Sequence, residues 1–307
     1  MATQTAMNLS HRPLLLGVIF ALLAAVGFSA KAILVKLAYR DDVDAVTLLG
    51  LRMALSVPFF VAVALWTRRH NAPRLGRHDW VLVLVLGLTG YYLSSFLDFL
   101  GLQYISAGLE RMILFLYPTM TVLLSALIYR RRISGKVIAA MLLSYAGIAL
   151  VFLHDVETNQ RAVVLGAALV FASTLSYSVY LVGAGHAIAR IGAARFTAYA
   201  MTVACSASLL QFAVTHAPEA LNLPLRVYGL AAAMAVFSTV LPVFLLSYAI
   251  RRIGSSSASL IGSAGPVSTL FLAHVFLQEQ VSLLQITGST LVLIGVVMIS
   301  LNSSKAV

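Results

Sequence analysis

Apolar residues follow one another in long runs separated by short polar stretches. The runs are roughly 18 to 25 residues long, the length with which a helix crosses a hydrocarbon core of about 30 Å. They lack the dyad alternation of a membrane barrel, and only helices and closed barrels satisfy their backbone polar groups in lipid. The pattern predicts ten membrane-spanning helices, at about 14 to 37, 46 to 67, 79 to 103, 106 to 129, 135 to 153, 163 to 185, 193 to 215, 226 to 250, 255 to 277 and 282 to 301.

Composition agrees with this interpretation. Hydrophobic residues make up 61% of the 307 residues and charged residues 10%, with a mean hydropathy of +0.96. A soluble core does not need so much apolar material. The predicted fold class is an all-α polytopic membrane protein. Its first span carries no small-residue cleavage pattern, so we expect that helix to be retained.

The stretch from residue 104 to 151 returns in altered form 148 residues later. The equivalent positions keep one register without a gap, and they include Ile105 and Ile253, Pro118 and Pro266, Thr121 and Thr269, and Gly147 and Gly295. This period is too long for a solenoid repeat and indicates a duplicated half-molecule. We expect a first five-helix repeat at 1–153, an outer connecting loop at 154–161 and a second repeat at 162–307.

Positive charge gathers in the loops on one side of the predicted spans. With the N-terminus inside, the cytoplasmic side holds Arg12, Arg68, Arg69, Arg74, Arg77, Arg130, Arg131, Arg132, Lys136, Arg190, Arg195, Arg251, Arg252 and Lys305. The outer side holds Arg40, Arg161 and Arg226, with Asp41, Asp42, Asp44, Asp155, Glu157, Glu219 and Glu279. The positive-inside rule then predicts that both termini are cytoplasmic.

Five spans per repeat is an odd number, so the second copy enters the membrane in the opposite orientation. Inverted repeats of this kind are typical of transporters, which expose a central site to either side in turn. The net charge of +11 thus follows from insertion topology, and we expect no nucleic-acid partner.

The sequence resembles the drug/metabolite transporter superfamily, of the EamA-like ten-helix type. The resemblance is carried by YISAGLERMILFLYPTMTVLLSALIYRRRISGKVIAAMLLSYAGIALV and SASLIGSAGPVSTLFLAHVFLQEQVSLLQITGSTLVLIGVVMIS, and by the order Pro266, Glu279, Gly295. The first copy departs from that order, with Arg131 at the acidic position. The Leu-Tyr-Pro run ending at Pro118 looks most like bacterial amino-acid exporters, including those for aromatic amino acids. The resemblance implies a ten-helix inner-membrane exporter with a central cavity between its halves.

Six charged residues fall within or at the ends of the predicted spans: Lys31, Lys36, Arg52, Asp98, Glu110 and Arg111. Because charge in hydrocarbon is costly, each must face protein or water. Lys36 is expected to snorkel to the outer interface. Arg52 and Asp98 are expected to form a buried ion pair, with Glu110 and Arg111 as further ion-pair or coupling candidates. Alternatively, Glu110 has only a structural role, because a carboxylate is stabilised by the positive end of a helix dipole.

Polar residues at helical spacing mark the candidate cargo site. The third span places Tyr91, Ser95 and Asp98 on one face, and the fourth places Glu110 and Tyr117 on one face. A tyrosine gives an apolar wall with one hydrogen-bonding tip, although each tyrosine also suits packing. The candidate substrate-binding residues are Lys31, Tyr91, Ser95, Asp98, Tyr117, Tyr177, Tyr180 and Ser263.

The in-span prolines are candidates for kinks and gates, since each removes a backbone hydrogen bond. They are Pro118, Pro242 and Pro266, together with Pro58. The small residues of the ninth span, Ser263 among them, also suit close helix packing.

No catalytic, phosphate-binding or metal-binding motif is found, so neither an enzyme nor a cofactor is predicted. The single cysteine, Cys205, cannot form an intramolecular disulfide. The sequence favours a secondary transporter in a bacterial inner membrane that exports amino acids by alternating access, with both halves in one chain and therefore able to work as a monomer. Alternatives are an exporter of drugs or other metabolites, an intramembrane enzyme and a receptor.

Overall fold

The computed structural model describes residues 2–69, 75–130, 133–156, 160–262 and 265–303, and every regular element within them is a helix. The first half holds α1 (Ala2–Tyr39), α2 (Ala45–Arg69), α3 (Arg77–Gly87), η1 (Leu88–Leu93), α4 (Ser94–Gly101), α5 (Ala107–Leu114), α6 (Tyr117–Ile128) and α7 (Gly135–Val156). The second holds α8 (Gln160–Ile191), α9 (Ala193–Thr215), η2 (Pro218–Leu221), α10 (Leu225–Ala235), η3 (Val236–Val240), α11 (Leu241–Gly262), α12 (Gly265–Leu272), η4 (Ala273–Leu277) and α13 (Leu283–Ser303). The segments η1, η3 and η4 are π-helical, and η2 is a 3₁₀ helix.

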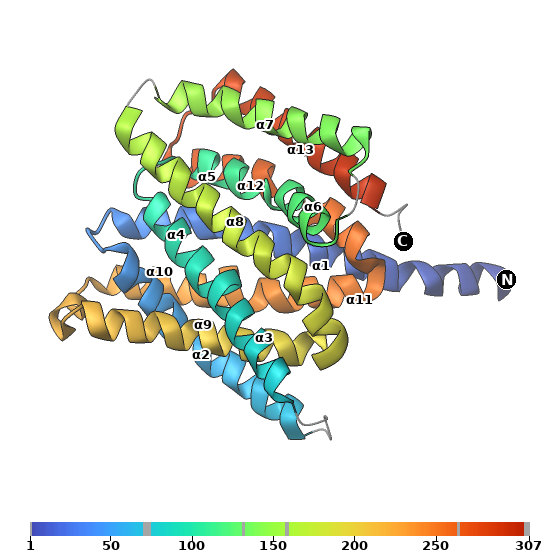
Figure 1. Cartoon of the computed structure of the whole chain (residues 1–307), viewed down its shortest axis with the longest axis horizontal. Helices are drawn as coiled ribbons and strands as arrows, with labels where there is room; N and C mark the ends of the chain where they lie inside the picture. Colours follow the sequence, from blue (N-terminus) through green and yellow to red (C-terminus); the bar gives the residue numbers. More distant parts are fainter. Residues whose placement is uncertain (1, 70–74, 131–132, 157–159, 263–264, 304–307) are drawn as a thin grey trace.

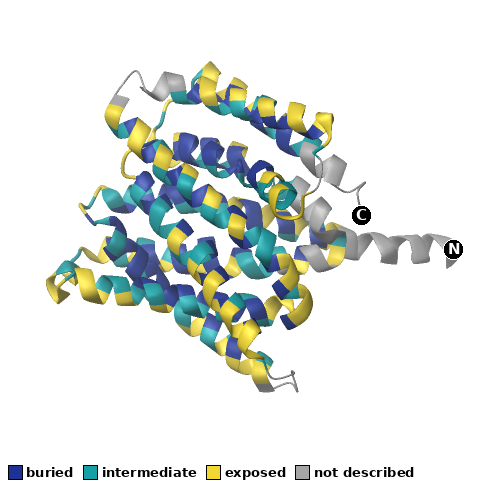
Figure 2. Ribbon diagram, viewed as in Figure 1, coloured by how far each residue is buried: buried dark blue, intermediate teal, exposed yellow. Residues whose placement is uncertain are grey.

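The helices are long and apolar enough to cross a bilayer. Eight segments of the described chain reach membrane-spanning length, and Gly265–Leu277 and Leu283–Met298 are shorter apolar helices. Exposed residues cover the outer faces of the bundle (Figure 2), and large apolar side chains such as Leu127, Val214 and Leu225 are among them. An apolar surface of this extent is what a lipid-facing bundle needs. The all-α polytopic class is therefore confirmed.

The two halves repeat each other at the predicted offset. Equivalent elements begin 148 residues apart, at Ala45 and Ala193, Arg77 and Leu225, Leu88 and Val236, Tyr117 and Gly265, and Gly135 and Leu283. Their packing is equivalent too, since α2 contacts α9, α7 contacts α13, and the contact of α1 with α11 corresponds to that of α8 with α4. Helix α1 begins, and α13 ends, at the same end of the bundle (Figure 1).

Helices α7 and α13 approach each other closely at glycines. A Cβ atom at Gly147 would lie 2.5 Å from the backbone oxygen of Gly288, and one at Gly288 would lie 2.5 Å from that of Gly147. A Cβ atom at Gly295 would lie 2.1 Å from Ser144 Oγ. Such small residues let two backbones touch. The repeated pair Gly147 and Gly295 thus belongs to one interface between the halves.

The fourth span, Ala107–Ile128, lies where the sequence predicts it, and its helix is interrupted in the middle, beside the proline expected to kink it. Helix α5 ends at Leu114 and α6 begins at Tyr117, with Pro118 in its first turn. Proline favours a first turn because that position needs no N–H donor. Hydropathy does not detect such a break, since both pieces are apolar.

The boundary between the eighth and ninth spans also differs from the prediction. Helix α11 continues through the loop expected at 251–254 and ends at Gly262, and α12 begins at Gly265 with Pro266 as its second residue. Helices α6 and α12 therefore start at equivalent positions of the two repeats.

Candidate functional site

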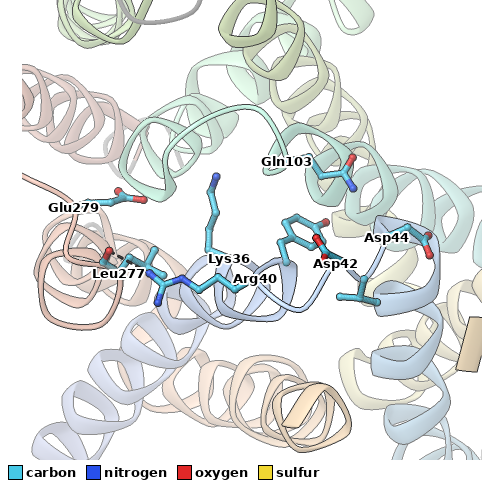
Figure 3. Close-up of a pocket in the computed structure, with 9 residues that line it drawn as sticks. Lys36, Arg40, Asp42, Asp44, Gln103, Leu277 and Glu279 are labelled. Carbon is cyan, nitrogen blue, oxygen red and sulfur yellow. Dashed lines mark hydrogen bonds between the residues drawn. The ribbon is translucent and has the colours of Figure 1, made fainter. Parts of the chain in front are cut away.

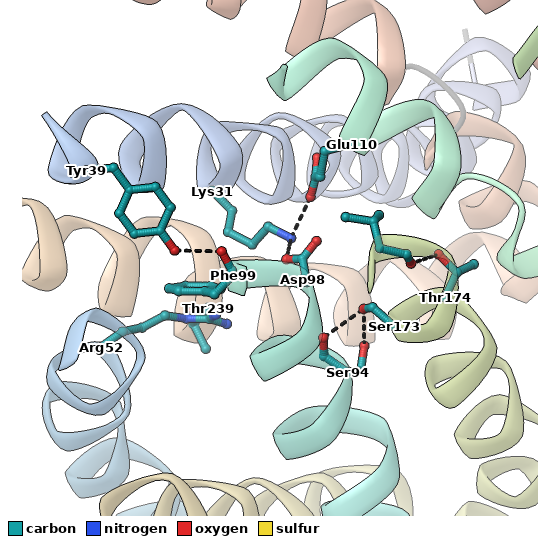
Figure 4. A network of polar contacts seen from close by, with 11 residues as sticks. Lys31, Tyr39, Arg52, Ser94, Asp98, Phe99, Glu110, Ser173, Thr174 and Thr239 are labelled. Carbon is teal, nitrogen blue, oxygen red and sulfur yellow. Dashed lines mark hydrogen bonds and ion pairs between the residues drawn. The ribbon is translucent and has the colours of Figure 1, made fainter. Parts of the chain in front are cut away.

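A buried ion cluster joins three spans of the first repeat. Lys31 of α1 forms an ion pair with Asp98 of α4, and its Nζ lies 2.9 Å from Glu110 Oε1 on α5. The side chains of these residues are 15%, 4% and 0% exposed, respectively. Figure 4 shows the ammonium between the two carboxylates. Sequence reasoning selected all three residues but did not bring them together.

Arg52 has a different partner from the one predicted. Its Nε donates a hydrogen bond to Thr239 Oγ1 at 2.9 Å, and its guanidinium lies 5.3 Å from the centre of the Phe99 ring. Since Asp98 pairs with Lys31, the predicted Arg52–Asp98 pair was wrong. Helical spacing placed both residues at one depth, but it did not show that Lys31 of α1 lies nearer to Asp98.

The tyrosines form a second cluster, on α8 and the spans beside it. Tyr91 and Tyr180 share a hydrogen bond between their hydroxyls at 2.9 Å. The ring of Tyr177 stacks on that of Tyr180 at 5.5 Å and meets Tyr117 edge-on at 5.7 Å. Phe196 of α9 also stacks on Tyr180, at 6.2 Å. Tyr91, Tyr117, Tyr177 and Tyr180 are therefore brought together as expected, although whether they bind cargo stays a prediction.

The residues predicted to share one face of the third span, and those predicted to share one face of the fourth, contact different neighbours in the structure. Tyr91 lies in the π-helical η1, whose wider turn sends it toward α8, whereas Asp98 turns toward α1. Ser95 is half-buried between them on α4. In the fourth span the break separates Glu110, which faces Lys31, from Tyr117, which faces α8. The rule of 3.6 residues per turn does not hold across a π turn or a break.

Hydroxyl groups of α8 lie against the third and fourth spans, and sequence reasoning missed most of them. The Oγ1 of Thr174 and the Oγ of Ser178 lie 3.3 Å from the backbone oxygens of Ile113 and Tyr117, while each is 2.8 Å from the backbone oxygen four residues earlier in α8. Ser173 donates to the backbone oxygen of Ser94 at 2.7 Å. The signal in the sequence is weak, because a hydroxyl in a helix usually bonds within its own helix.

The gating candidates lie at or next to irregular backbone. Pro118 and Pro266 stand in the first turns of α6 and α12, and Pro242 is the second residue of α11, which begins where η3 ends. Pro58 lies inside α2, which continues through it. Their role in gating stays a prediction. Ser263 lies outside the described residues.

A cavity of about 590 Å³ opens at the end of the bundle where α1 joins α2. Charged residues of both signs line it, among them Lys36, Arg40, Asp42, Asp44 and Glu279. Figure 3 shows these residues around the opening, with Lys36 extending into the space between Glu279 and Gln103. Lys36 thus lines a cavity between segments of both halves, with charges of both signs in its wall.

Glu279 links the second repeat to the first beside this cavity. Its Oε1 accepts a hydrogen bond from the backbone N–H of Ala107 at 3.3 Å, at the first residue of α5. Arg40 donates to the backbone oxygen of Leu277 at 3.3 Å. A carboxylate at a helix N-terminus is favoured by the helix dipole. Glu279, the acidic residue noted in the second copy, therefore caps the N-terminus of α5, where the fourth span begins.

The described residues show no group of three or more His, Cys, Asp or Glu placed to hold a metal ion. What the site offers is buried charge of both signs next to aromatic rings, inside a bundle of repeated, broken helices. Fold and site together define a polytopic membrane transporter. The chain belongs to the EamA-like transporter family, which it matches over residues 15–153 and again over 164–301. The predicted superfamily is thereby confirmed.

Similar proteins carry the same general description. The transporter YcbK of Bacillus subtilis (strain 168), named as uncharacterized, is 34% identical over 89% of this chain and 88% of its own length. An uncharacterized transporter of Archaeoglobus fulgidus is 25% identical over 82% of this chain and 87% of its own. One crystal structure at 20% identity superposes over 94% of this chain and 98% of its own, with a TM-score of 0.66, and supports the fold. None of these names specifies a cargo.

Proposed function

We propose that this transporter exports small amphipathic metabolites that carry both charges, with amino acids of apolar side chain as the principal cargo. The observation that carries the proposal is the buried cluster of Lys31, Asp98 and Glu110. Ionisable groups inside a membrane bundle are costly and are usually kept for a substrate or ion pathway. A cluster with both signs suits a zwitterion, and the neighbouring tyrosine rings suit an apolar side chain.

Alternating access follows from the architecture. Two inverted repeats that exchange conformations exchange the side that is open, while the site stays near the midplane. We place the protein in a bacterial inner membrane with both termini cytoplasmic, on the basis of the charge asymmetry of the loops. With both halves in one chain, the monomer is the proposed unit.

Inverted membrane vesicles from an expressing strain test the cargo. Vesicles with the wild-type chain should accumulate labelled aromatic amino acids faster than vesicles with Asp98→Ala or Tyr117→Ala. Cells that express the wild type should also resist toxic amino-acid analogues. If vesicles accumulate drugs or nucleotide precursors and no amino acids, the cargo assignment is wrong. If the variants match the wild type in both assays, the site assignment is wrong.

The energy source is tested separately. Proteoliposome flux that increases with an imposed pH gradient supports proton coupling through the carboxylates of the cluster. Flux that depends only on the amino-acid gradient supports a facilitator, in which the cluster orders the helices and cargo without carrying a proton.

A further inference from the structure

Arg111 lies where α5 of the first repeat meets α12 of the second. It precedes the break that follows Leu114 by one turn, and it touches the first residue of α12. A Cβ atom at Gly265 would lie 2.5 Å from its Nη2 and 3.2 Å from its Cζ and Nε. The guanidinium therefore occupies space that exists only because position 265 has no side chain.

The charge of Arg111 has no ion-pair partner within the part of the chain that the structure describes. Glu110, its neighbour in sequence, turns away toward Lys31. The Nε atom of Arg111 is buried and makes no hydrogen bond to the described residues. Among the described residues, its guanidinium lies over the ring of Phe115, with Cζ 5.6 Å from the ring centre. A buried guanidinium donor without an acceptor is costly, which calls for an explanation beyond folding.

Aromatic side chains continue from this guanidinium. The Phe115 ring beneath it meets the Tyr117 ring edge-on at 5.9 Å, and Tyr117 in turn meets Tyr177 edge-on at 5.7 Å. A guanidinium binds a carboxylate through two parallel hydrogen bonds, which an ammonium group cannot do. An arginine at the end of a row of aromatic rings thus offers one place for a carboxylate and another for an apolar body.

Two other cations lie inside the bundle. Lys31 is held by Asp98 and Glu110, and Arg52 donates through Nε to Thr239, although its Nη1 has no hydrogen-bond partner among the described residues. We propose that Arg111 binds the carboxylate of the cargo at the junction of α5 and α12, with Gly265 leaving room for its guanidinium and Tyr117 and Tyr177 contacting the apolar part. This inference rests on the proposed function and deepens it, because it names the chemical group of the cargo that is bound and the residue that binds it.

Three probes and the protein in lipid nanodiscs test the proposal by calorimetric titration. L-phenylalanine carries both charges, L-phenylalaninamide lacks the carboxylate, and 3-phenylpropionate lacks the ammonium. The wild type should bind L-phenylalanine at least about 30-fold more tightly than the amide, because loss of one partner of a buried charge pair costs at least that factor. This comparison needs no variant, so misfolding cannot conceal the result.

Variants then locate the effect. Arg111→Gln should weaken binding of L-phenylalanine and 3-phenylpropionate by at least about 30-fold and leave the amide within about threefold. Gly265→Ala should give the same selective loss, since its methyl group displaces the guanidinium. Arg161→Gln, at an exposed arginine at the start of α8, is the matched control and should bind all probes as the wild type does.

The outcomes separate this inference from the proposed function. Arg111 does not bind the carboxylate if the amide binds as tightly as the amino acid, or if Arg111→Gln weakens the binding of all probes equally. Neither result contradicts the proposal of amino-acid export. If 3-phenylpropionate binds in an Arg111-dependent way and amino acids are neither bound nor transported, the carboxylate site stands and the amino-acid assignment fails. If the wild type binds none of the three, both proposals fail.

Discussion

Lys31 Nζ lies 2.9 Å from Glu110 Oε1 while it also pairs with Asp98, so one ammonium serves two carboxylates. All three residues belong to the first repeat, yet α1 packs mainly on α11 and α12 of the second. A movement of α1 with the second repeat would therefore pull Lys31 away from at least one of its partners. Whether Lys31 can keep both ion pairs would therefore depend on how the two halves are positioned relative to each other.

Lys31→Met should destabilise the protein strongly. The methionine keeps most of the side-chain volume but leaves Asp98 and Glu110 facing each other without a cation. Removing one partner of a buried ion pair usually costs about 3–5 kcal/mol. Thermal unfolding of the purified protein in detergent, followed by intrinsic fluorescence, measures the loss as a lower Tm.

The control for this prediction is a double variant. Lys31→Met combined with Glu110→Gln removes one of the two uncompensated charges, so its Tm should lie above that of Lys31→Met alone. A Lys31→Met protein with the Tm of the wild type would show that the ion pairs contribute nothing to stability. Equal Tm values for the single and double variants would show that Glu110 is not the partner that matters.

Gly288→Ala should weaken the contact between α7 and α13. The added methyl group would lie 2.5 Å from the backbone oxygen of Gly147, so the helices must separate. Overpacking of a tight interface costs about 1–3 kcal/mol. Gly185→Ala is the matched control, because a Cβ atom at this position of α8 meets nothing within 4 Å. It should be neutral, or stabilising by about 0.5–1 kcal/mol. Thermal unfolding of both proteins checks the difference, and an unchanged Tm for Gly288→Ala would contradict the close approach.

Much of the fold follows from the sequence because hydropathy and the repeat are long-range signals. The ten apolar runs and the offset that relates Pro118 to Pro266 each average over many residues, so single exceptions do not hide them. The break before Tyr117 and the π turn at Tyr91 are local departures from helix geometry. Each packs against α8, a helix from the other half of the chain, so the local sequence alone does not specify it.

The sequence predicts which residues belong to the site better than it predicts which of them form ion pairs. Charge in an apolar run is conspicuous, which is why Lys31, Asp98 and Glu110 were selected. Which cation meets which carboxylate depends on the rotation and depth of α1 against α4 and α5, and the sequence fixes neither to within a side chain. For the same reason the sequence does not predict the contact between Arg111 and Gly265, which are far apart in the chain.

Asp44 should stabilise the start of α2 in a pH-dependent way. Its Oδ1 accepts hydrogen bonds from the backbone N–H groups of Val46 at 2.8 Å and Thr47 at 3.0 Å. Partial burial raises the pKa of Asp44, but the hydroxyl and backbone amide of Thr47, with His216 and Val46, outweigh it and hold that pKa below its ordinary value of 3.8. Asp44→Ala should cost about 1 kcal/mol at neutral pH.

The sign of the pH dependence follows from the lowered pKa. The contribution of Asp44 is complete above its ordinary pKa of 3.8 and is lost as the pH falls through the lower pKa of the folded state. The gap in Tm between the wild type and Asp44→Ala should therefore close in acid. Asp44→Asn keeps a side chain that caps helices nearly as well, and it should retain most of the stability at neutral pH. A gap that stays constant down to pH 3 would assign the effect to something other than the carboxylate.

The orientation of the bundle can be tested with single cysteines. The native Cys205 is fully buried and should not react with a membrane-impermeant maleimide, so Cys205 leaves a low background. Asn222, in the loop before α10, and Lys136, in the first turn of α7, are both exposed. The excess of arginine and lysine on the side of Lys136 predicts that this side is cytoplasmic.

In intact cells, Asn222→Cys should label from outside and Lys136→Cys should label only after the membrane is made permeable. Each variant must first retain transport in inverted vesicles, so that the labelled protein is the folded one. The reverse pattern would place the termini outside and overturn the direction of transport, although not the inverted repeat. Labelling of both cysteines from outside would contradict the number of crossings between the fifth and seventh spans, and with it the basis for alternating access.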